Sequence, residues 1–292
     1  MLQLSTLEAL RNTRTAWANE RASVAFVPTM GNLHAGHLRL VEHAKTLADK
    51  VIVSIYVNPM QFGANEDLDS YPRTLAADME KLEQAGAHAV FTPTTDMVYP
   101  RGLAEQTFIE VPAISDILCG ASRPGHFRGV ATIVNKLFNM VQPDHAVFGK
   151  KDYQQLMVIR LMVDDLSMPV IIHGVATERA SNGLALSSRN GYLSAAEREQ
   201  ATAIYRTMQS AAAALQQHAP SVSEEQIKAI ASQCQLQLKQ AGFTPDYVSI
   251  RSQRDLGAVR EGERELVILV AAYMGKTRLI DNLEVSLTFS TR

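Results

Sequence analysis

Residues 26–37 decide the fold, and they read Phe26-Val27-Pro28-Thr29-Met30-Gly31-Asn32-Leu33-His34-Ala35-Gly36-His37. The stretch begins as a short apolar strand, continues as a glycine-bearing loop, and ends with two histidines where a helix starts. Phosphates favour backbone N–H groups and the positive end of a helix dipole, and two imidazoles add further donors. The stretch therefore predicts a cradle for a triphosphate. The alternative is a plain turn, because Pro, Gly and Asn are ordinary turn residues and such histidines can be surface groups.

The composition is typical of one or two globular domains. The chain has 292 residues, of which 46% are hydrophobic and 20% are charged, so it can bury a full core. Its 28 basic residues are dispersed among 30 acidic ones, which argues against a nucleic-acid partner. We expect no membrane partner and a cytoplasmic location, because no long apolar run and no signal peptide is visible. Cys119 and Cys234 are far apart, so neither a disulfide scaffold nor a metal site is expected.

Short apolar strands alternate with helical patterns through the first 176 residues. The expected strands cover residues 24–27, 51–57, 89–91, 146–148 and 170–173. Apolar residues at helical spacing follow the first strand, and further helical faces cover residues 75–82 and 130–141. This alternation predicts an α/β domain over residues 1–176, a Rossmann-like, doubly wound parallel sheet that binds the nucleotide and the co-substrate.

Polar loops follow three of the expected strands. They carry the two histidines, residues 58–63 and residues 149–155. Ligands of doubly wound sheets bind beyond the carboxyl ends of the strands, where such loops gather. We therefore expect these three loops to converge on one edge.

The pattern changes after Ala176, and we expect a smaller α+β domain over residues 177–292. Ser194 with Glu197, and Ser223 with Gln226, have the spacing of capping boxes that open helices. Strands are expected at residues 247–250, 266–271 and 277–280, the last two joined by a hairpin turn. The polar, glycine-containing segment 178–190 can bend over a site at the domain boundary, so this domain is expected to close over the site.

Five sequence blocks carry a family resemblance. His34-Ala35-Gly36-His37 and Leu186-Ser187-Ser188-Arg189 resemble the HIGH and KMSKS-type signatures of the nucleotidylyltransferase superfamily. The chain is more specifically similar to the pantoate-β-alanine ligase family, also called pantothenate synthetases. The blocks that carry this similarity are Pro28-Thr29-Met30-Gly31, Asn58-Pro59-Met60-Gln61-Phe62, Arg123-Pro124-Gly125-His126-Phe127-Arg128-Gly129-Val130, Phe148-Gly149-Lys150-Lys151-Asp152-Tyr153-Gln154-Gln155 and Leu186-Ser187-Ser188-Arg189-Asn190.

The resemblance implies a two-step ligation in the biosynthesis of a coenzyme A precursor. ATP adenylates the carboxylate of (R)-pantoate and pyrophosphate leaves, and then the amine of β-alanine attacks the acyl-adenylate to give pantothenate and AMP. A carboxylate is a poor acyl donor, so an enzyme of this kind holds two anions together while charge accumulates on the phosphates. The resemblance also implies Mg²⁺, which binds mostly through substrate phosphates, and a homodimer.

The same resemblance assigns roles to individual residues. His34, His37 and Lys151 are the expected catalytic residues, with His37 as the candidate proton donor. Gln61 and Gln155 are expected to bind pantoate, and Gln61 also β-alanine. The expected ATP-binding residues are Met30, Gly31, Asn32, Leu33, His34, Ala35, Gly36, His37, Gly149, Lys150, Lys151, Asp152, Glu178, Leu186, Ser187, Ser188 and Arg189.

Three positions depart from the family pattern. Ala35 stands where an acidic residue is usual, Cys119 where glutamate is common, and Glu178 where an apolar residue usually lies beside adenine.

Arg123 and Arg128 flank a glycine-rich turn and are expected to close over phosphates.

Two other functions remain open on the sequence. One is an adenylyltransferase of the same fold that makes a pyrophosphate-linked product, against which Gln61 and Gln155 argue. The other is a non-catalytic nucleotide-binding protein. The presence of His34, His37, Lys151 and Arg189 argues against it, because binding alone does not require donors at the bond being broken.

Overall fold

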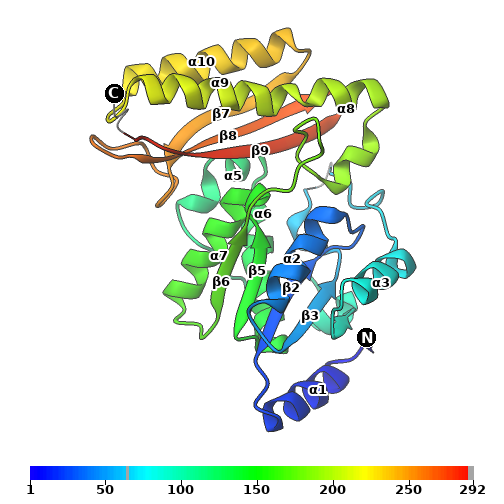
Figure 1. The fold of residues 1–292 in the computed structure, drawn as a ribbon. Coiled ribbons are helices and arrows are strands. Elements are labelled where there is room, and N and C mark those ends of the chain that lie inside the picture. The colour runs from blue at the N-terminus through cyan, green and yellow to red at the C-terminus, as the bar shows by residue number, and fades with distance from the viewer. Residues whose placement is uncertain (64–65, 289–292) are drawn as a thin grey trace. The chain divides into compact units, whose positions relative to one another are not determined.

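The computed structural model describes residues 1–63 and 66–288 (Figure 1). The chain divides into two compact units. The first contains Met1–Lys150 and Gln155–Ala176, and the second contains Lys151–Gln154 and the described chain from Thr177 onward. The functions expected of the two parts, substrate binding in one and closure over the site by the other, stay predictions.

The first unit is built on a parallel sheet, as the sequence predicts, and this sheet has six strands (Figure 1). The spatial order is β1-β4-β3-β2-β5-β6. β1 is an addition to the five expected strands, and it pairs with β4 through only three residues. The strands are β1 Leu2–Leu4, β2 Val24–Thr29, β3 Lys50–Ile55, β4 Ala89–Phe91, β5 His145–Gly149 and β6 Ile171–Val175.

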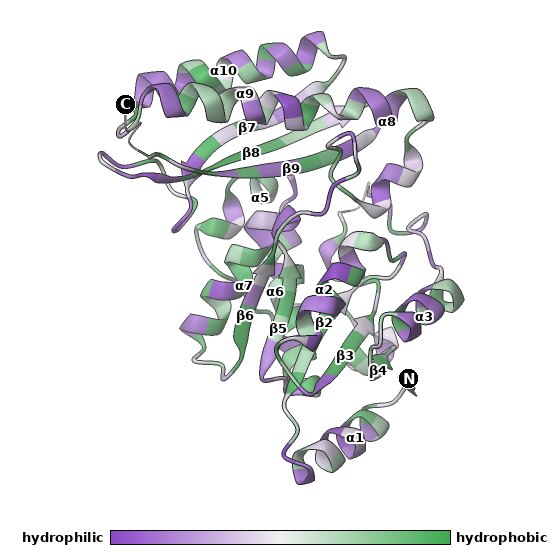
Figure 2. Ribbon diagram, in the orientation of Figure 1, coloured by the Kyte–Doolittle hydropathy of each residue, from purple (hydrophilic) through white to green (hydrophobic). Residues whose placement is uncertain are grey.

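Helices cover this sheet and contribute apolar faces to its core. Val41 and Ala44 of α2 are buried in one cluster with Val27 and Val53 of the strands, and Figure 2 shows β2, β3 and β5 as largely hydrophobic. Strands covered on both faces read as continuous apolar runs, which is why these were visible in the sequence. The helices are α1 Leu7–Asn19, α2 Ala35–Lys45, α3 Leu75–Gln84, α4 Thr95–Val98, α5 Cys119–Ser122, α6 His126–Val141 and α7 Tyr153–Asp165, with 3₁₀ turns η1 Pro59–Gln61, η2 Ile114–Asp116 and η3 Lys150–Asp152.

The strand order reverses between β2 and β5. The chain runs from β2 through α2 to β3 on one side of β2, whereas β5 pairs with the other side. Ligands of doubly wound sheets bind at such a switch point, beyond the carboxyl ends of the strands. The loop that begins at Met30 and the residues that follow Gly149 therefore lie at the expected binding edge.

The second unit contains a three-stranded antiparallel sheet in the order β7-β8-β9. Its strands are β7 Thr244–Ser252, β8 Glu265–Met274 and β9 Thr277–Ser286. The hairpin between β8 and β9 turns at Gly275 and Lys276, where Gly275 has a φ of 57°. The predicted small α+β architecture is confirmed.

The helices of this unit are α8 Ala195–Ala201, α9 Ala203–Gln217 and α10 Glu224–Gln240, with the 3₁₀ turn η4 Ser188–Tyr192. Both predicted capping boxes are present, at Ser194 and Ser223. The first was expected to open one long helix, but the helix breaks at Thr202, whose hydroxyl donates to the Glu199 carbonyl at 2.7 Å. Such a local bond competes with the helical pattern and tightens the turn. Figure 2 shows that α9 and α10 contain both hydrophilic and hydrophobic residues, as expected for helices that cover a sheet.

Candidate active site

The loop after β2 turns sharply before the two histidines. Gly31 has a φ of 83° and Asn32 has a φ of 49°, so both adopt the left-handed conformation. A Cβ on Gly31 would lie 3.1 Å from a side-chain carbon of Ile55 and 3.2 Å from Asp78 Oδ2. Glycine is therefore the residue that fits this buried turn, for both conformation and space.

The buried carboxylate of Asp78 holds this loop through hydrogen bonds. Asp78 of α3 accepts the backbone N–H groups of Asn32 and Leu33, each at 2.8 Å, and is fully buried. Lys81 Nζ donates to the Leu33 carbonyl at 2.7 Å. The two N–H groups are thus occupied inside the fold. They are therefore not available to a ligand, unlike the groups at the start of α2.

The two histidines form the start of α2. His34 Nδ1 accepts the Gly36 N–H at 3.2 Å, and His37 Nδ1 accepts the His34 N–H at 3.3 Å. The ring centroids are 4.1 Å apart. Because a backbone N–H can only donate, both Nδ1 atoms are acceptors, and each neutral ring carries its proton on Nε2. The pair therefore carries its two Nε2–H groups at a helix N-terminus, and such an N-terminus suits an anion.

The loop after β3 brings the predicted pantoate residue Gln61 to the loop after β2. Gln61 Nε2 lies 3.1 Å from Met30 Sδ, and Gln61 Oε1 accepts from Asn58 Nδ2 at 3.2 Å. Gly129 of α6 packs on this loop so closely that a Cβ there would lie 2.3 Å from the Met60 carbonyl oxygen. The structure therefore joins Met30 and Gln61, as the convergence of loops predicts.

The structure gives Arg123 and Arg128 partners other than those expected. Arg123 forms two bonds of 2.6 Å to the Glu66 carboxylate and a third, of 3.3 Å, to the Gln61 carbonyl. Arg128 binds Glu110 at 2.9 and 3.1 Å. A guanidinium that is already paired with a carboxylate has less charge to offer a phosphate. Arg123 supports the backbone of the Gln61 loop, and closure of Arg123 and Arg128 over phosphates stays a prediction.

The remaining predicted residues of the first unit lie beside the end of β5. Gly149 is the last residue of β5, and Lys150 begins η3. Gln155 lies in the first turn of α7 and is half-buried. These positions belong to the edge at which β2 and β5 end.

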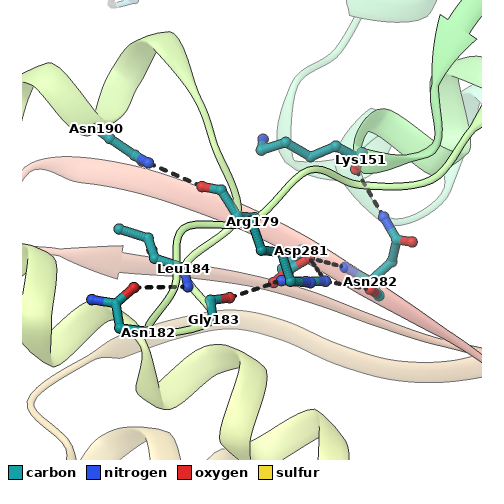
Figure 3. Close-up of polar contacts among 9 residues, drawn as sticks. Lys151, Arg179, Asn182, Gly183, Leu184, Asn190, Asp281 and Asn282 are labelled. Carbon is teal, nitrogen blue, oxygen red and sulfur yellow. Dashed lines mark hydrogen bonds and ion pairs between the residues drawn. The ribbon is translucent and has the colours of Figure 1, made fainter. Parts of the chain in front are cut away.

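In the second unit, β9 anchors both Lys151 and the segment that contains Ser187 (Figure 3). Asn282 Nδ2 donates to the Lys151 carbonyl at 2.8 Å. The preceding residue, Asp281, forms a bidentate ion pair with Arg179, at 2.6 and 2.9 Å. Arg179 also stacks on Tyr205, 3.8 Å from the ring centroid. Two consecutive residues of one strand therefore fix two of the predicted ATP-binding segments.

The segment 178–190 folds back on itself as a short antiparallel pair. The Leu186 N–H donates to the Glu178 carbonyl at 2.9 Å, so the backbone of Glu178 has a structural role. Ser187 caps η4 by accepting the Arg189 N–H at 3.3 Å. Ser187, Ser188 and Arg189 are half-buried, whereas Asp152 is exposed. Like Lys151, these residues belong to the second unit.

Neither a metal cluster nor a membrane span occurs in the part of the chain that the structure describes. Among residues 1–63 and 66–288, no group of three or more His, Cys, Asp or Glu side chains could hold a metal ion. No helix within those ranges is long and apolar enough to cross a membrane.

Sequence reasoning missed the residues that hold these loops. Asp78 stands three residues after Leu75 and four before Leu82, so a charged residue on the apolar face of a helix was the available signal. Asp281 and Asn282 similarly interrupt an apolar strand. A polar residue at a position that the pattern buries must find a partner, and here the partners are the site loops.

The fold, the histidine-capped helix at the switch point and the loops around it define a nucleotide-binding α/β enzyme. A family model described as pantoate-beta-alanine ligase matches residues 3–284. The chain belongs to this family, and it is therefore a ligase of pantothenate biosynthesis.

Curated relatives and solved structures agree with this assignment. The chain is 57% identical to the pantothenate synthetase of Shewanella loihica, over 97% of this chain and 98% of that protein. It is 60% identical to that of Idiomarina loihiensis, over 97% of each. The structure of the Thermus thermophilus pantothenate synthetase has a TM-score of 0.89 and 42% identity, covering 98% of this chain and 100% of that one. That of the Francisella tularensis pantoate-beta-alanine ligase, complexed with beta-gamma ATP and beta-alanine, has a TM-score of 0.77 and 34% identity, covering 97% of each chain.

Proposed function

We propose that this chain uses ATP to join (R)-pantoate to β-alanine through a pantoyl-adenylate, giving pantothenate, AMP and pyrophosphate. The observation that carries the proposal is the pair His34 and His37. Their rings lie 4.1 Å apart at the switch point of the sheet, and both have Nδ1 committed to the backbone. Two preorganised Nε2–H donors suit a reaction in which negative charge builds up on phosphate oxygens.

In the proposed first step, a carboxylate oxygen of pantoate attacks the α-phosphorus of ATP and pyrophosphate leaves. His34 and His37 donate Nε2–H hydrogen bonds to the phosphates, and the His37 bond is directed toward the leaving pyrophosphate. Lys151 supplies a point charge. Ser187, Ser188 and Arg189 supply hydroxyls and a guanidinium to the pyrophosphate end. The other ATP-binding residues predicted from the sequence, from the loop after β2, from 149–152 and from Glu178 and Leu186, keep that role in the proposal.

In the proposed second step, the amine nitrogen of β-alanine attacks the acyl carbon, and AMP leaves with the oxygen that came from pantoate. Gln61 and Gln155 bind pantoate, and Gln61 also contacts β-alanine. Neutral amides suit this task because they hold the carboxylate without an ion pair that would weaken it as a nucleophile. Alignment of two bound reactants contributes a large share of the rate in such a reaction.

Mg²⁺ enters the proposal as part of the ATP substrate. This ion keeps water ligands and commonly binds through substrate phosphates with few protein carboxylates. It neutralises phosphate charge when bound, while the histidines and Lys151 orient the triphosphate. A homodimer and a cytoplasmic location, both expected from the sequence, also stay predictions.

The proposal is tested by following pyrophosphate and AMP in purified protein supplied with ATP and pantoate. We expect a pyrophosphate burst of about one equivalent per site without β-alanine, and steady AMP release only when β-alanine is added. AMP release that ignores β-alanine, or no turnover at all, would exclude the ligase reaction.

A further inference from the structure

Asn58 is a buried amide with all four of its hydrogen-bonding sites occupied. Its side chain is 1% exposed. Its Oδ1 accepts from the Tyr99 hydroxyl at 2.7 Å and from the Met60 backbone N–H at 3.3 Å. Its Nδ2 donates to the Gly129 carbonyl and to Gln61 Oε1, each at 3.2 Å. An asparagine amide has two acceptor sites and two donor hydrogens, so none is left over.

Two backbone groups fix which way the Asn58 amide faces. The Met60 N–H can only donate, so the atom beside it must be the oxygen. The Gly129 carbonyl can only accept, so the atom on that side must be the NH₂ group. The orientation of this amide is therefore set by the fold. In a flipped amide, the NH₂ group would face the Met60 N–H and the oxygen would face the Gly129 carbonyl.

The orientation of Asn58 then determines that of Gln61. Because Asn58 presents an NH₂ group, the Gln61 atom that faces it must be the carbonyl oxygen. The Gln61 NH₂ group is left on the other side, where one contact is the Met30 sulfur at 3.1 Å. A thioether is a weak acceptor, so a substrate oxygen would replace it readily. Gln61 therefore offers donors, and not its oxygen, to whatever binds beside Met30.

Tyr99, which lies outside the loop, supplies the second hydrogen bond to Asn58 Oδ1. It is 2% exposed and follows α4, forty-one residues from Asn58 in the chain. Burial, with Tyr56 nearby, raises the pKa of Tyr99 well above the usual tyrosine value. The hydroxyl stays protonated and donates to Asn58 Oδ1, reinforcing the orientation that the Met60 N–H selects.

We propose that Tyr99 is a positioning residue that acts through Asn58 and holds the Gln61 amide with its NH₂ group turned toward pantoate. The inference rests on the proposed function, because it assumes that Gln61 binds pantoate. The oxygens of a carboxylate or hydroxyl are the matching acceptors. Without the Tyr99 hydroxyl, Asn58 Oδ1 keeps only its longer bond to the Met60 N–H, so the Asn58 amide, and through it the Gln61 amide, is held less tightly.

The test compares Tyr99→Phe with Tyr56→Phe. Tyr56 is a matched control because it is also buried, at 7% exposure, and its hydroxyl donates to Thr95 Oγ1 at 3.4 Å and not to Asn58. A lost hydrogen bond is typically about 1 kcal/mol, which corresponds to roughly fivefold. We expect Tyr99→Phe to raise the KM for pantoate about fivefold, with kcat and the KM for ATP within about twofold of wild type. Tyr56→Phe should leave all three within about twofold.

Two outcomes of this comparison would overturn the inference. One is equal behaviour of the two variants. The other is a parallel change of kcat and both KM values in Tyr99→Phe, which a merely structural role would give. Failure of the proposed function is distinguished by the wild-type protein, which would then show no pantoate-dependent pyrophosphate release.

Gln61→Glu tests the orientation independently of Tyr99. The glutamate keeps an acceptor for Asn58 but has no N–H to offer pantoate. We expect its KM for pantoate to rise at least about tenfold, as expected for a lost bond to a charged group. A KM close to that of wild type would show that Gln61 presents its oxygen to the substrate, and would overturn the inference.

Discussion

The carboxylate of Asp78 accepts a hydrogen bond from the backbone N–H of Leu33 at 2.8 Å, and this contact links α3 to the loop that leads into α2. The second oxygen of Asp78 accepts from Asn32 and from the Thr74 hydroxyl. The loop that positions His34 is therefore held by a buried side chain of α3.

Asp78→Asn should destabilise the protein by about 1–3 kcal/mol. Asparagine has one acceptor oxygen, so its NH₂ group would face the N–H of Asn32 or Leu33 and leave that donor unsatisfied. The unfolding midpoint in urea measures the loss. Glu80→Gln is the control, because Glu80 is exposed on the same helix. Equal midpoints for the two variants would contradict the role of Asp78.

Asp281→Asn should weaken the second unit and reduce the affinity for ATP. Asp281 is 4% and Arg179 is 16% exposed in the side chain, and removing one charge of a buried pair costs about 3–5 kcal/mol. Urea unfolding and the KM for ATP measure the two effects. Lys228→Gln breaks an exposed pair of the same unit and should leave the unfolding midpoint close to that of wild type. An unchanged midpoint in Asp281→Asn would show that β9 does not anchor the segment around Arg179.

Stability should fall as the pH drops below about 6.5, the ordinary pKa of histidine. Burial lowers the pKa of His173, with further contributions from His145, His43 and Arg160. A histidine whose pKa is lowered on folding favours the neutral form in the folded protein. Its contribution to stability is present above the unfolded pKa and is lost as the pH falls through the folded pKa.

Thermal unfolding at pH 7.5 and pH 5.5 measures this effect. His173→Gln can still hydrogen-bond His145, whose Nδ1 lies 3.0 Å from His173 Nε2. The variant should lose less stability between the two pH values than wild type. His88 has a lowered pKa as well, so part of the loss should remain. An identical loss in both proteins would remove His173 from the acid response.

His37→Ala should lower kcat for adenylation by about 10²-fold or more, the usual effect of losing a donor to the transition state. The KM for pantoate should change much less, because the donor acts mainly as charge develops. Single-turnover pyrophosphate release measures the step. An unchanged kcat would exclude His37 from the chemistry.

The sequence predicted the elements whose patterns are local. Buried strands such as β2 are continuous apolar runs, and the capping boxes at Ser194 and Ser223 lie within four residues of sequence. β1 was missed because three residues are too few for a pattern. The break at Thr202 was missed because the residues on both sides of it are helical.

The supports of the candidate site could not be predicted in the same way. Asp78 and Leu33 are 45 residues apart, and Tyr99 and Asn58 are 41 apart, so their meeting depends on the order of strands in the sheet. The partner of Arg123, Glu66, was likewise not visible in the sequence, because 57 residues separate the two. A motif gives the residue types at a site, whereas the partners that orient them come from the fold.

Pantoate labelled with ¹⁸O in its carboxylate tests the central claim most directly. If the chain forms pantoyl-adenylate, the attacking oxygen stays on phosphorus when β-alanine displaces AMP. Mass spectrometry of the products should then show one ¹⁸O in each AMP, with pyrophosphate unlabelled and one ¹⁸O retained in pantothenate. Pantothenate formed with unlabelled AMP, or label in phosphate or pyrophosphate, would contradict the acyl-adenylate route.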